Sequence, residues 1–142
     1  MTIWHGKPTI EQANGVIPGT MMGHIGLRFT EIGDDYLCAT LPVDERTVQP
    51  MGLLHGGASV VLAETLGSAG GMLTLNPETH FCVGLEINAN HIRSARSGEV
   101  VGRGEPLHIG GSTQIWSIRI EDDSGRLTCV SRITLAVLER TV

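Results

Sequence analysis

The most informative side chain in this sequence is an isolated acid, Glu64, in the middle of the apolar stretch from Gly56 to Leu73. No Lys or Arg lies within one helical turn of it, and carboxylates are rarely buried without a partner. Glu64 is therefore expected to face a pocket or a subunit interface, as a nucleophile or a general base. Ser68 lies four residues further on, on the same helix face, where its hydroxyl could hold a water against the carboxylate. The alternatives are a solvated stripe that includes Thr65, and a serine used only for packing.

Hydrogen-bond donors precede this stretch. The sequence His55-Gly56-Gly57 opens the predicted helix, and the free N–H groups at a helix N-terminus favour negative charge. Because Gly56 has no side chain, a substrate carbonyl can approach its amide, which would then act as an oxyanion donor. Gln49, six residues upstream in a loop, offers a side-chain amide as a second donor. The alternatives are an ordinary glycine-rich helix start and a solvated loop residue.

Basic side chains gather in the second half of this acidic chain. Arg93, Arg96 and Arg103 put three of the ten lysines and arginines into eleven positions, where they could bind phosphates. His91 continues an apolar alternation and should point to the buried side of its strand. The segment from His108 to Thr113 offers backbone N–H groups and hydroxyls to a phosphate, although it is not a P-loop. The alternatives are a solvated edge, a core histidine and a plain strand turn.

One helix and a set of strands must position these residues. Residues 56–73 predict a helix that is apolar around almost its whole circumference and is therefore buried. Gly67, Gly70 and Gly71 each cost about 1 kcal/mol against alanine there, so another element should pack closely on them. In the following strand, apolar residues recur at every second position and should share one buried face: Phe81, Val83, Leu85, Ile87 and Ala89.

The other elements follow from turn signals and alternation. Residues 9–22 predict a short, interrupted helical lead-in, and residues 44–55 an ordered connection. Further strands are expected at 27–32, 36–43, 98–108, 113–121 and 127–138, with turns at 33–35 and 122–125. Short turns between consecutive strands favour antiparallel pairing. The predicted fold is α+β: a long central helix wrapped by a curved, five- or six-stranded antiparallel sheet.

Composition and charge exclude several classes of protein. The 142 residues fit a single domain, 1–142, whose net charge of −5 argues against a nucleic-acid binder. A single lysine argues against a polybasic membrane patch, and Glu64 with five glycines in 56–71 argues against a membrane span. Three widely spaced cysteines and an N-terminus without an apolar signal core predict free thiols in the cytoplasm. The sequence has no metal-ligand spacing, nucleotide-binding fingerprint or serine-hydrolase motif.

The chain resembles the hotdog-fold acyl-CoA thioesterases of the 4-hydroxybenzoyl-CoA thioesterase type. The resemblance lies in Gln49-Pro50-Met51-Gly52-Leu53-Leu54-His55-Gly56-Gly57-Ala58-Ser59, in Glu64, and in Gly84-Leu85-Glu86-Ile87-Asn88-Ala89-Asn90-His91. It points to the branch of 1,4-dihydroxy-2-naphthoyl-CoA thioesterase and the proofreading thioesterase of enterobactin synthesis, over nearly the whole chain. It implies a hotdog fold, a homodimer with sheets joined edge to edge, and a tetramer made of two dimers.

The resemblance also implies roles for individual residues. The active site would lie at the dimer interface, with the Gly56 amide and Gln49 holding the thioester oxygen and His55 lining the site. Glu64 of the facing subunit would attack the carbonyl or activate water, assisted by Ser68. The residues that contact CoA would be Gly84, His91, Ile92, Arg93, Ser94, His108, Ile109, Gly110, Gly111, Ser112 and Thr113.

The sequence departs from the family in one loop. Relatives carry an arginine where this chain reads Gly110-Gly111-Ser112-Thr113. Binding of the nucleotide phosphates would therefore fall to Arg93, Arg96 or Arg103.

Residues and resemblance both point to thioester hydrolysis, which develops an oxyanion and needs a nucleophile. We expect an acyl-CoA thioesterase that releases free acid and CoA from an aromatic or medium-chain acyl-CoA, with acyl-carrier-protein thioesters as further candidates. No metal or redox cofactor is expected, since CoA is part of the substrate. The candidate lining residues of the acyl pocket are Met22, Met51, Leu54, Ala69 and Met72.

Two other functions stay open at this point. A hotdog hydratase or dehydratase would pair His55 or His91 with Glu64 for proton transfer. A non-catalytic module would bind acyl-CoA without turnover. Release of a free thiol separates hydrolysis from both.

Overall fold

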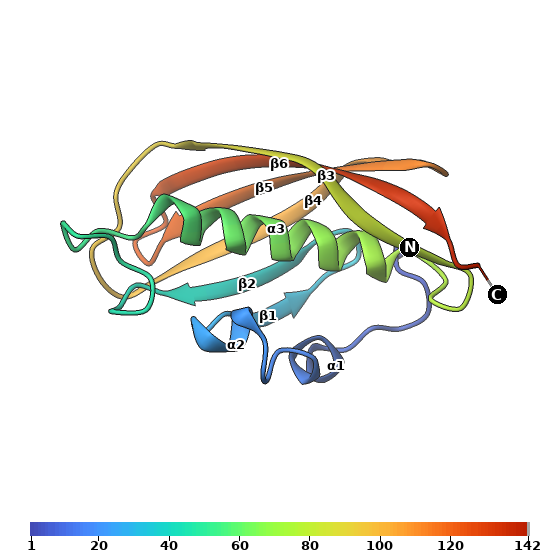
Figure 1. The fold of residues 1–142 in the computed structure, drawn as a ribbon, viewed down its shortest axis with the longest axis horizontal. Helices are drawn as coiled ribbons and strands as arrows, with labels where there is room; N and C mark the ends of the chain where they lie inside the picture. The colour runs from blue at the N-terminus through green and yellow to red at the C-terminus, as the bar shows by residue number, and fades with distance from the viewer. Residues whose placement is uncertain (142) are drawn as a thin grey trace.

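The chain folds as an antiparallel sheet wrapped around a long helix (Figure 1). The computed structural model describes residues 1–141, which form helices α1 (Ile10–Gly15), α2 (Met21–His24) and α3 (Gly56–Leu73). The strands are β1 (Arg28–Ile32), β2 (Leu37–Pro42), β3 (His80–His91), β4 (Glu99–Ile109), β5 (Thr113–Asp122) and β6 (Leu127–Glu139). Within the described residues the six strands lie in the order β1-β2-β4-β5-β6-β3, with every neighbouring pair antiparallel. The predicted α+β class is confirmed, and each predicted strand is correct to within one residue at either end.

The sheet packs on the glycine face of α3, which spans the residues predicted for it. A Cβ placed on Gly67 would lie 2.3 Å from the Ile133 side chain, and one on Gly71 would lie 2.4 Å from Leu135. Strand β6 therefore comes closer to the helix backbone than any side chain would allow, as the glycines predicted. The opposite side of α3 is only half-buried in the protomer, so the expectation of a helix buried all round is wrong. That half-buried side carries Glu64.

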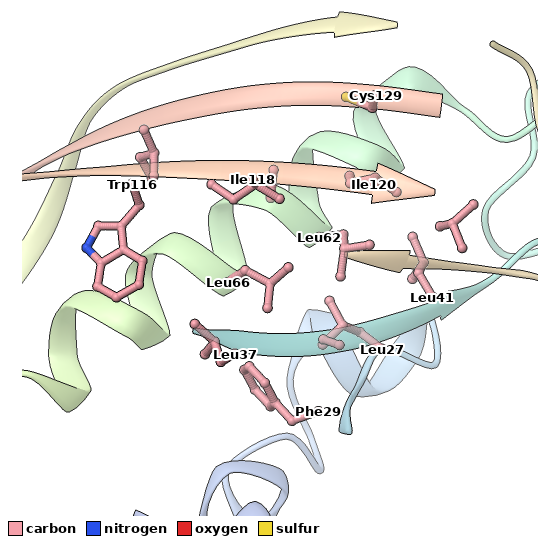
Figure 2. Close-up of a cluster of buried hydrophobic side chains, with 14 of the residues drawn as sticks. Leu27, Phe29, Leu37, Leu41, Leu62, Leu66, Trp116, Ile118, Ile120 and Cys129 are labelled. Atoms are coloured by element: carbon pink, nitrogen blue, oxygen red, sulfur yellow. The ribbon is translucent and has the colours of Figure 1, made fainter. Parts of the chain in front are cut away.

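The core lies between α3 and the sheet (Figure 2). Leu62 and Leu66 of α3 are fully buried against the inward side chains of β5, which alternate along the strand as predicted. Burying a leucine of this kind contributes about 2 kcal/mol. The largest fully buried side chains are Trp116, Leu37, Leu41, Leu62, Leu66, Ile118, Ile120, Ile133 and Leu135. This core fixes α3 relative to the strands that carry the other candidate site residues.

Strand β3 lies at one edge of the sheet and contains a β-bulge. Its pairing with β6 shifts between Gly84 and Glu86, which leaves Leu85 as the extra residue. Ahead of the bulge, the even-numbered residues face α3, since Cys82 Sγ lies 3.9 Å from the Ser68 carbonyl oxygen. An extra residue reverses the alternation of side chains along a strand.

Because of the bulge, the burial of side chains along β3 differs from the prediction. Ile87 and Ala89, which follow it, pack against the core as expected. Val83 and Leu85 instead point away from α3 and are exposed, so the prediction of one continuous buried face from Phe81 is wrong in its first half.

The N-terminal segment is held against the sheet at two points. Trp4 stacks on Trp116, with 6.1 Å between ring centroids, and its Nε1–H donates to the Gly33 carbonyl oxygen at 2.6 Å. At α1, the Asn14 side-chain amide both donates to and accepts from the Phe29 backbone, each at 2.9 Å. These contacts attach α1 to the β1 margin of the sheet, where Figure 1 shows both short helices.

Candidate active site

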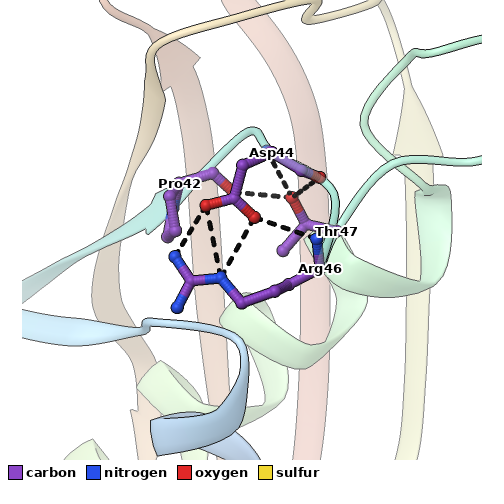
Figure 3. Close-up of polar contacts among 4 residues, drawn as sticks. All are labelled: Pro42, Asp44, Arg46 and Thr47. Carbon is purple, nitrogen blue, oxygen red and sulfur yellow. Dashed lines mark hydrogen bonds and ion pairs between the residues drawn. The ribbon is translucent and has the colours of Figure 1, made fainter.

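The loop that carries Gln49 is ordered, as predicted, and begins with a compact polar turn (Figure 3). Arg46 Nη2 lies 2.6 Å from Asp44 Oδ2, and Thr47 Oγ1 donates to the Pro42 carbonyl oxygen at 2.7 Å. The hydrogen bond from the Arg46 side chain lowers the pKa of Asp44. The turn thus fixes the chain two residues before Gln49.

Gln49 presents an amide donor. Its Oε1 accepts the Met51 N–H at 2.5 Å, so the side-chain carbonyl is engaged and the NH2 group is the part left to donate elsewhere. The loop closes through an isolated bridge between Val48 and Leu54, and the Leu54 N–H donates to the Ala95 carbonyl oxygen at 2.8 Å. These bonds position Gln49 beside the start of α3.

The first turn of α3 leaves one backbone donor free within the described residues. His55 is the N-cap, and its Nδ1 accepts the Gly57 N–H at 2.8 Å. The Ala58 and Ser59 N–H groups donate to the His55 carbonyl oxygen at 2.9 and 3.3 Å. The Gly56 N–H has no acceptor within residues 1–141. His55 therefore accepts the hydrogen bonds of the three backbone N–H groups that follow Gly56, and the Gly56 N–H stays available to a ligand.

The Gly56 amide opens into a cavity of about 280 Å³, which we call the amide cavity. A Cβ on Gly56 would lie 2.9 Å from His91 Nε2, so the absence of a side chain lets the His91 ring lie over the helix start. The amide cavity brings together many of the predicted residues and is lined by Gln49, Leu53, Leu54, Gly56, Ser59, His91, Ile92, Arg93, Ser94, Ala95 and Thr128. His55 adjoins it through the cap without lining it.

Glu64 lines a second cavity, of about 560 Å³, which we call the carboxylate cavity. Ser68 Oγ donates to Glu64 Oε1 at 3.3 Å, which confirms the predicted same-face pair. On the other side, a Cβ on Gly84 would lie 2.9 Å from Glu64 Oε1, so this glycine gives the carboxylate room beside β3. The cavity is lined by Pro8, Thr9, Gln12, Ala13, Val16, Met22, Phe29, Glu64, Thr65, Ser68, Ala69, Met72 and Leu73.

One protomer keeps the two cavities apart. Gly56 and Glu64 are eight residues apart on α3, which is about 12 Å along the helix axis. No residue lines both cavities. The donors at Gly56 and Gln49 and the carboxylate at Glu64 therefore do not meet within a single copy of the chain.

The three arginines predicted to bind phosphate do not lie together in the structure. Of the three clustered arginines, Arg93 lines the amide cavity, where its Nη1 donates to the Leu127 carbonyl oxygen at 3.1 Å. Arg103 stacks over Tyr36, 3.4 Å from the ring centroid, and its Nε lies 2.5 Å from Glu105 Oε1. Arg96 is exposed and lines neither cavity.

The turn between β4 and β5, within His108–Thr113, lies at the far end of the sheet. Thr113 pairs with Ala136 of β6, whereas His91 pairs with Cys129. Seven residues of strand separate those two positions, about 23 Å. The protomer therefore does not bring this segment to the amide cavity.

Sequence reasoning found some wall residues and missed others. Of the residues predicted to line an acyl pocket, Met22, Ala69 and Met72 line the carboxylate cavity. Leu54 lines the amide cavity, and Met51 is exposed. The wall formed by α1 and the residues before it was missed. Its only local signal is the capping pair of Thr9 and Gln12, which marks a helix start but not a pocket.

Residues 1–141 hold no group of three or more His, Cys, Asp or Glu side chains that could hold a metal ion. No helix in the described part of the chain is long and apolar enough to cross a membrane. Cys38, Cys82 and Cys129 are free, and burial raises the pKa of all three thiols.

The sheet wrapped around one long helix is the hotdog fold of thioesterases. The chain belongs to the thioesterase superfamily, whose model matches residues 51–129. It is 57% identical over 136 residues to the 1,4-dihydroxy-2-naphthoyl-CoA hydrolase of Escherichia coli K12, covering 96% of this chain and 99% of that one. It is 50% identical over 136 residues to the proofreading thioesterase EntH of Cronobacter sakazakii, covering 96% and 98%. A crystal structure of a Haemophilus influenzae thioesterase superposes with a TM-score of 0.94 at 44% identity, covering 97% of this chain and 96% of that one. The resemblance predicted from the motifs is thus confirmed.

Proposed function

We propose that this protein hydrolyses aromatic or medium-chain acyl-CoA thioesters to free acid and CoA. The observation that carries the proposal is the division of the site: each protomer presents amide donors in one cavity and an unpaired carboxylate in another. Thioester hydrolysis needs both, one to stabilise the oxyanion and one to supply or activate the nucleophile. A second copy of the chain would complete each site.

In the proposed reaction, the thioester carbonyl oxygen accepts hydrogen bonds from the Gly56 N–H and the Gln49 amide. Glu64 of the partner subunit either attacks the carbonyl carbon or removes a proton from the water that attacks it. The tetrahedral intermediate collapses and the carbon–sulfur bond breaks. If water attacks, the free acid forms directly and the proton taken from the water goes to the CoA thiolate. If Glu64 attacks, an acyl–Glu64 anhydride forms, and water then hydrolyses it to release the free acid and regenerate the carboxylate, with a proton from water going to the thiolate. Ser68, which donates to Glu64 Oε1 at 3.3 Å, holds the carboxylate in place.

We propose that the two copies join along β3. The other edge of the sheet, β1, is covered by the Asn14 amide, which pairs with the Phe29 backbone. Strand β3 has 12 residues and pairs only with β6 within the described chain, so its outer edge can extend a sheet. It carries Gly84 and His91, one beside each cavity. A two-fold axis along this edge would give two equivalent sites per dimer, and two dimers would form the tetramer that we also propose.

The CoA part would lie on the amide cavity. Arg93 is the arginine that lines this cavity, and Ser94 lines it next to Arg93. We therefore propose these two residues as the contacts for the CoA phosphates. The β4–β5 turn, His108–Thr113, can contribute only from another copy of the chain. The name of the Escherichia coli relative, a 1,4-dihydroxy-2-naphthoyl-CoA hydrolase, favours an aromatic acyl group. Carrier-protein thioesters are the second substrate class that we propose. Three unbridged cysteines favour a reducing, cytoplasmic location.

The direct test is product analysis with benzoyl-CoA and octanoyl-CoA. We expect release of one free thiol, followed with a thiol reagent, and one carboxylic acid, identified by mass spectrometry. Cys38 and Cys129 are buried and Cys82 is half-buried, and the pKa of each thiol is raised, so the protein should contribute little to the thiol signal. A hydrated acyl-CoA with its thioester intact would favour the hydratase, and binding without turnover would favour the non-catalytic module.

A further inference from the structure

The carboxylate cavity extends from α3 to the N-terminal segment, and Glu64 is its single ionisable lining residue. Its volume of about 560 Å³ is in the range of small-molecule sites. One wall comes from α3, and the facing wall comes from residues 8–16, in and just before α1. Met22 and Phe29 complete it. A group whose carbonyl lies at Glu64 would therefore extend toward α1.

The α1 wall is part of the fold. The Gln12 N–H donates to Thr9 Oγ1 at 3.2 Å, and Gln12 Oε1 accepts the Thr9 N–H at 3.1 Å. This capping box starts the helix, and the Asn14 amide holds its end to the Phe29 backbone at 2.9 Å. The wall stands in place before any ligand binds, so it can limit the size of what enters.

Two side chains of this wall set the available space. Ala13 is half-buried and small, which leaves room between α1 and α3. Val16, one helical turn further, is apolar and yet 69% exposed while lining the same cavity. An apolar side chain at a cavity mouth is favourable when an apolar ligand covers it.

The charge of the residues that line the carboxylate cavity restricts the charge of the ligand. The lining residues include no Lys, Arg or His, and the carboxylate of Glu64 is the one charge among them. A second carboxylate on the ligand would be desolvated without a cation and close to a like charge, which is costly.

We propose that the carboxylate cavity holds the acyl group and that Ala13 of α1 and Val16, its C-cap, set the maximum size of that group. Acyl groups that carry a carboxylate are rejected. This inference rests on the proposed function, because it places the thioester carbonyl at Glu64. The substrate class is thus narrowed to uncharged aromatic or medium-chain acyl thioesters.

The test is a kcat/KM profile over butyryl-, hexanoyl-, octanoyl-, decanoyl-, benzoyl- and glutaryl-CoA, for the wild-type protein and four variants. Ala13→Phe fills the cavity and should lower the ratio of decanoyl- to butyryl-CoA kcat/KM about tenfold or more. Val16→Trp, at an exposed position that tolerates a large side chain, should lower it in the same direction. Glu11→Phe is the matched control, since Glu11 is exposed on α1 and does not line the cavity. The wild-type protein should prefer hexanoyl- over glutaryl-CoA by about a hundredfold.

The wild-type profile tests the proposed function, and the fourth variant, Glu64→Gln, tests the placement of the thioester carbonyl at Glu64. If the wild-type protein releases thiol from none of these substrates, the proposed function is wrong, and if Glu64→Gln stays active on every substrate, the placement of the carbonyl at Glu64 is wrong. If Glu64→Gln is inactive but Ala13→Phe and Val16→Trp keep the wild-type chain-length profile, the α1 wall does not set acyl size. Equal activity on hexanoyl- and glutaryl-CoA would overturn the exclusion of charged acyl groups. Circular dichroism of each variant checks that α1 substitutions leave the fold intact.

Discussion

Glu64 has no cationic partner within the described residues. The ion pairs of residues 1–141 join Arg46 to Asp44, Arg103 to Glu105 and Arg126 to Asp122. Glu64 instead has a hydroxyl, Ser68, on one side and a glycine, Gly84, on the other. A half-buried carboxylate in this setting keeps its lone pairs available for a substrate or a water.

Replacing the carboxylate should abolish most of the activity. Glu64→Gln keeps the shape of the side chain but removes its charge and its basicity. We expect a loss of at least about 3 kcal/mol of transition-state stabilisation, measured as kcat/KM on benzoyl-CoA. Near-normal kcat/KM would remove Glu64 from the mechanism.

Ser68→Ala provides the matched comparison on the same helix face. It removes one hydrogen bond to the carboxylate, and such bonds contribute about 1.5 kcal/mol. We therefore expect about a tenfold fall in kcat, clearly smaller than that of Glu64→Gln. A loss as large as that of Glu64→Gln would mean that Ser68 does more than orient the acid.

The sequence is sufficient to predict single residues whose contacts lie within a few positions along the chain. The pairing of Glu64 with Ser68 follows from helix spacing, and the donor at Gly56 follows from its place at a helix start. The stacking of Arg103 on Tyr36 could not be predicted, because Tyr36 lies in the turn before β2, far away in sequence. The role of Ala13 could not be predicted for the same reason, since the cavity exists only once α1 has docked.

The helix start is the element on which the proposed oxyanion site depends. His55 is a less common N-cap than Ser, Thr, Asp or Asn, and here its Nδ1 accepts the Gly57 N–H at 2.8 Å. We infer that its contribution to activity is to hold the first turn so that the Gly56 N–H points into the amide cavity.

A cap replacement tests this role. His55→Ala should lose about 1 kcal/mol of stability, or about 3–5 °C in Tm, and should lower kcat more than it changes KM. His55→Asn restores a good N-cap and should recover most of both losses. Thermal melts and steady-state kinetics measure the two effects. If Asn is no better than Ala, the imidazole acts on the substrate directly and the capping role fails.

The β5–β6 hairpin has a pH-dependent anchor in Asp122. Its Oδ1 accepts the Arg126 and Ser124 N–H groups at 3.0 and 2.9 Å, and Oδ2 lies 3.0 Å from the Arg126 guanidinium. The backbone hydrogen bond from Arg126 is the main cause that lowers the pKa of Asp122. A carboxyl group whose pKa is lower in the folded state adds stability above its unfolded pKa and loses it as the pH falls through the folded value.

The consequence is a pH-dependent effect of Asp122→Asn. The variant should have a lower Tm than the wild type at pH 7, and the gap should narrow as the pH falls from about 5 to about 2. Asp123→Asn is the matched control, since Asp123 is exposed and its side chain makes no hydrogen bond within residues 1–141. A gap that is constant over this range would show that the charge of Asp122 does not stabilise the hairpin.

At the scale of elements, periodicity and glycine placement were sufficient for α3 and for the strand positions. They failed at β3, where the alternation from Phe81 to Ala89 is regular in the sequence but the pairing with β6 contains a bulge. The bulge lets Gly84 face α3 beside Glu64. Its cause is tertiary, because the register is set against β6 and α3 rather than by the strand itself.

The molecule as a whole presents two separate cavities. The amide cavity and the carboxylate cavity border α3 at positions about 12 Å apart, and β3 runs past both. The predicted edge-to-edge dimer would turn this separation into two complete sites. The sequence alone could not show the separation, because it depends on which residues share a cavity.

Subunit complementation tests the shared site most directly. Glu64→Ala and Gln49→Ala chains with different tags are co-expressed, and the mixed dimers are isolated by tandem affinity purification. If the site is shared, a mixed dimer holds one site with both substitutions and one with neither. It should therefore recover about half of the wild-type kcat per dimer on benzoyl-CoA, whereas each parent homodimer stays inactive. Mixed dimers as inactive as their parents would contradict the account, because Glu64 and Gln49 would then act from the same subunit.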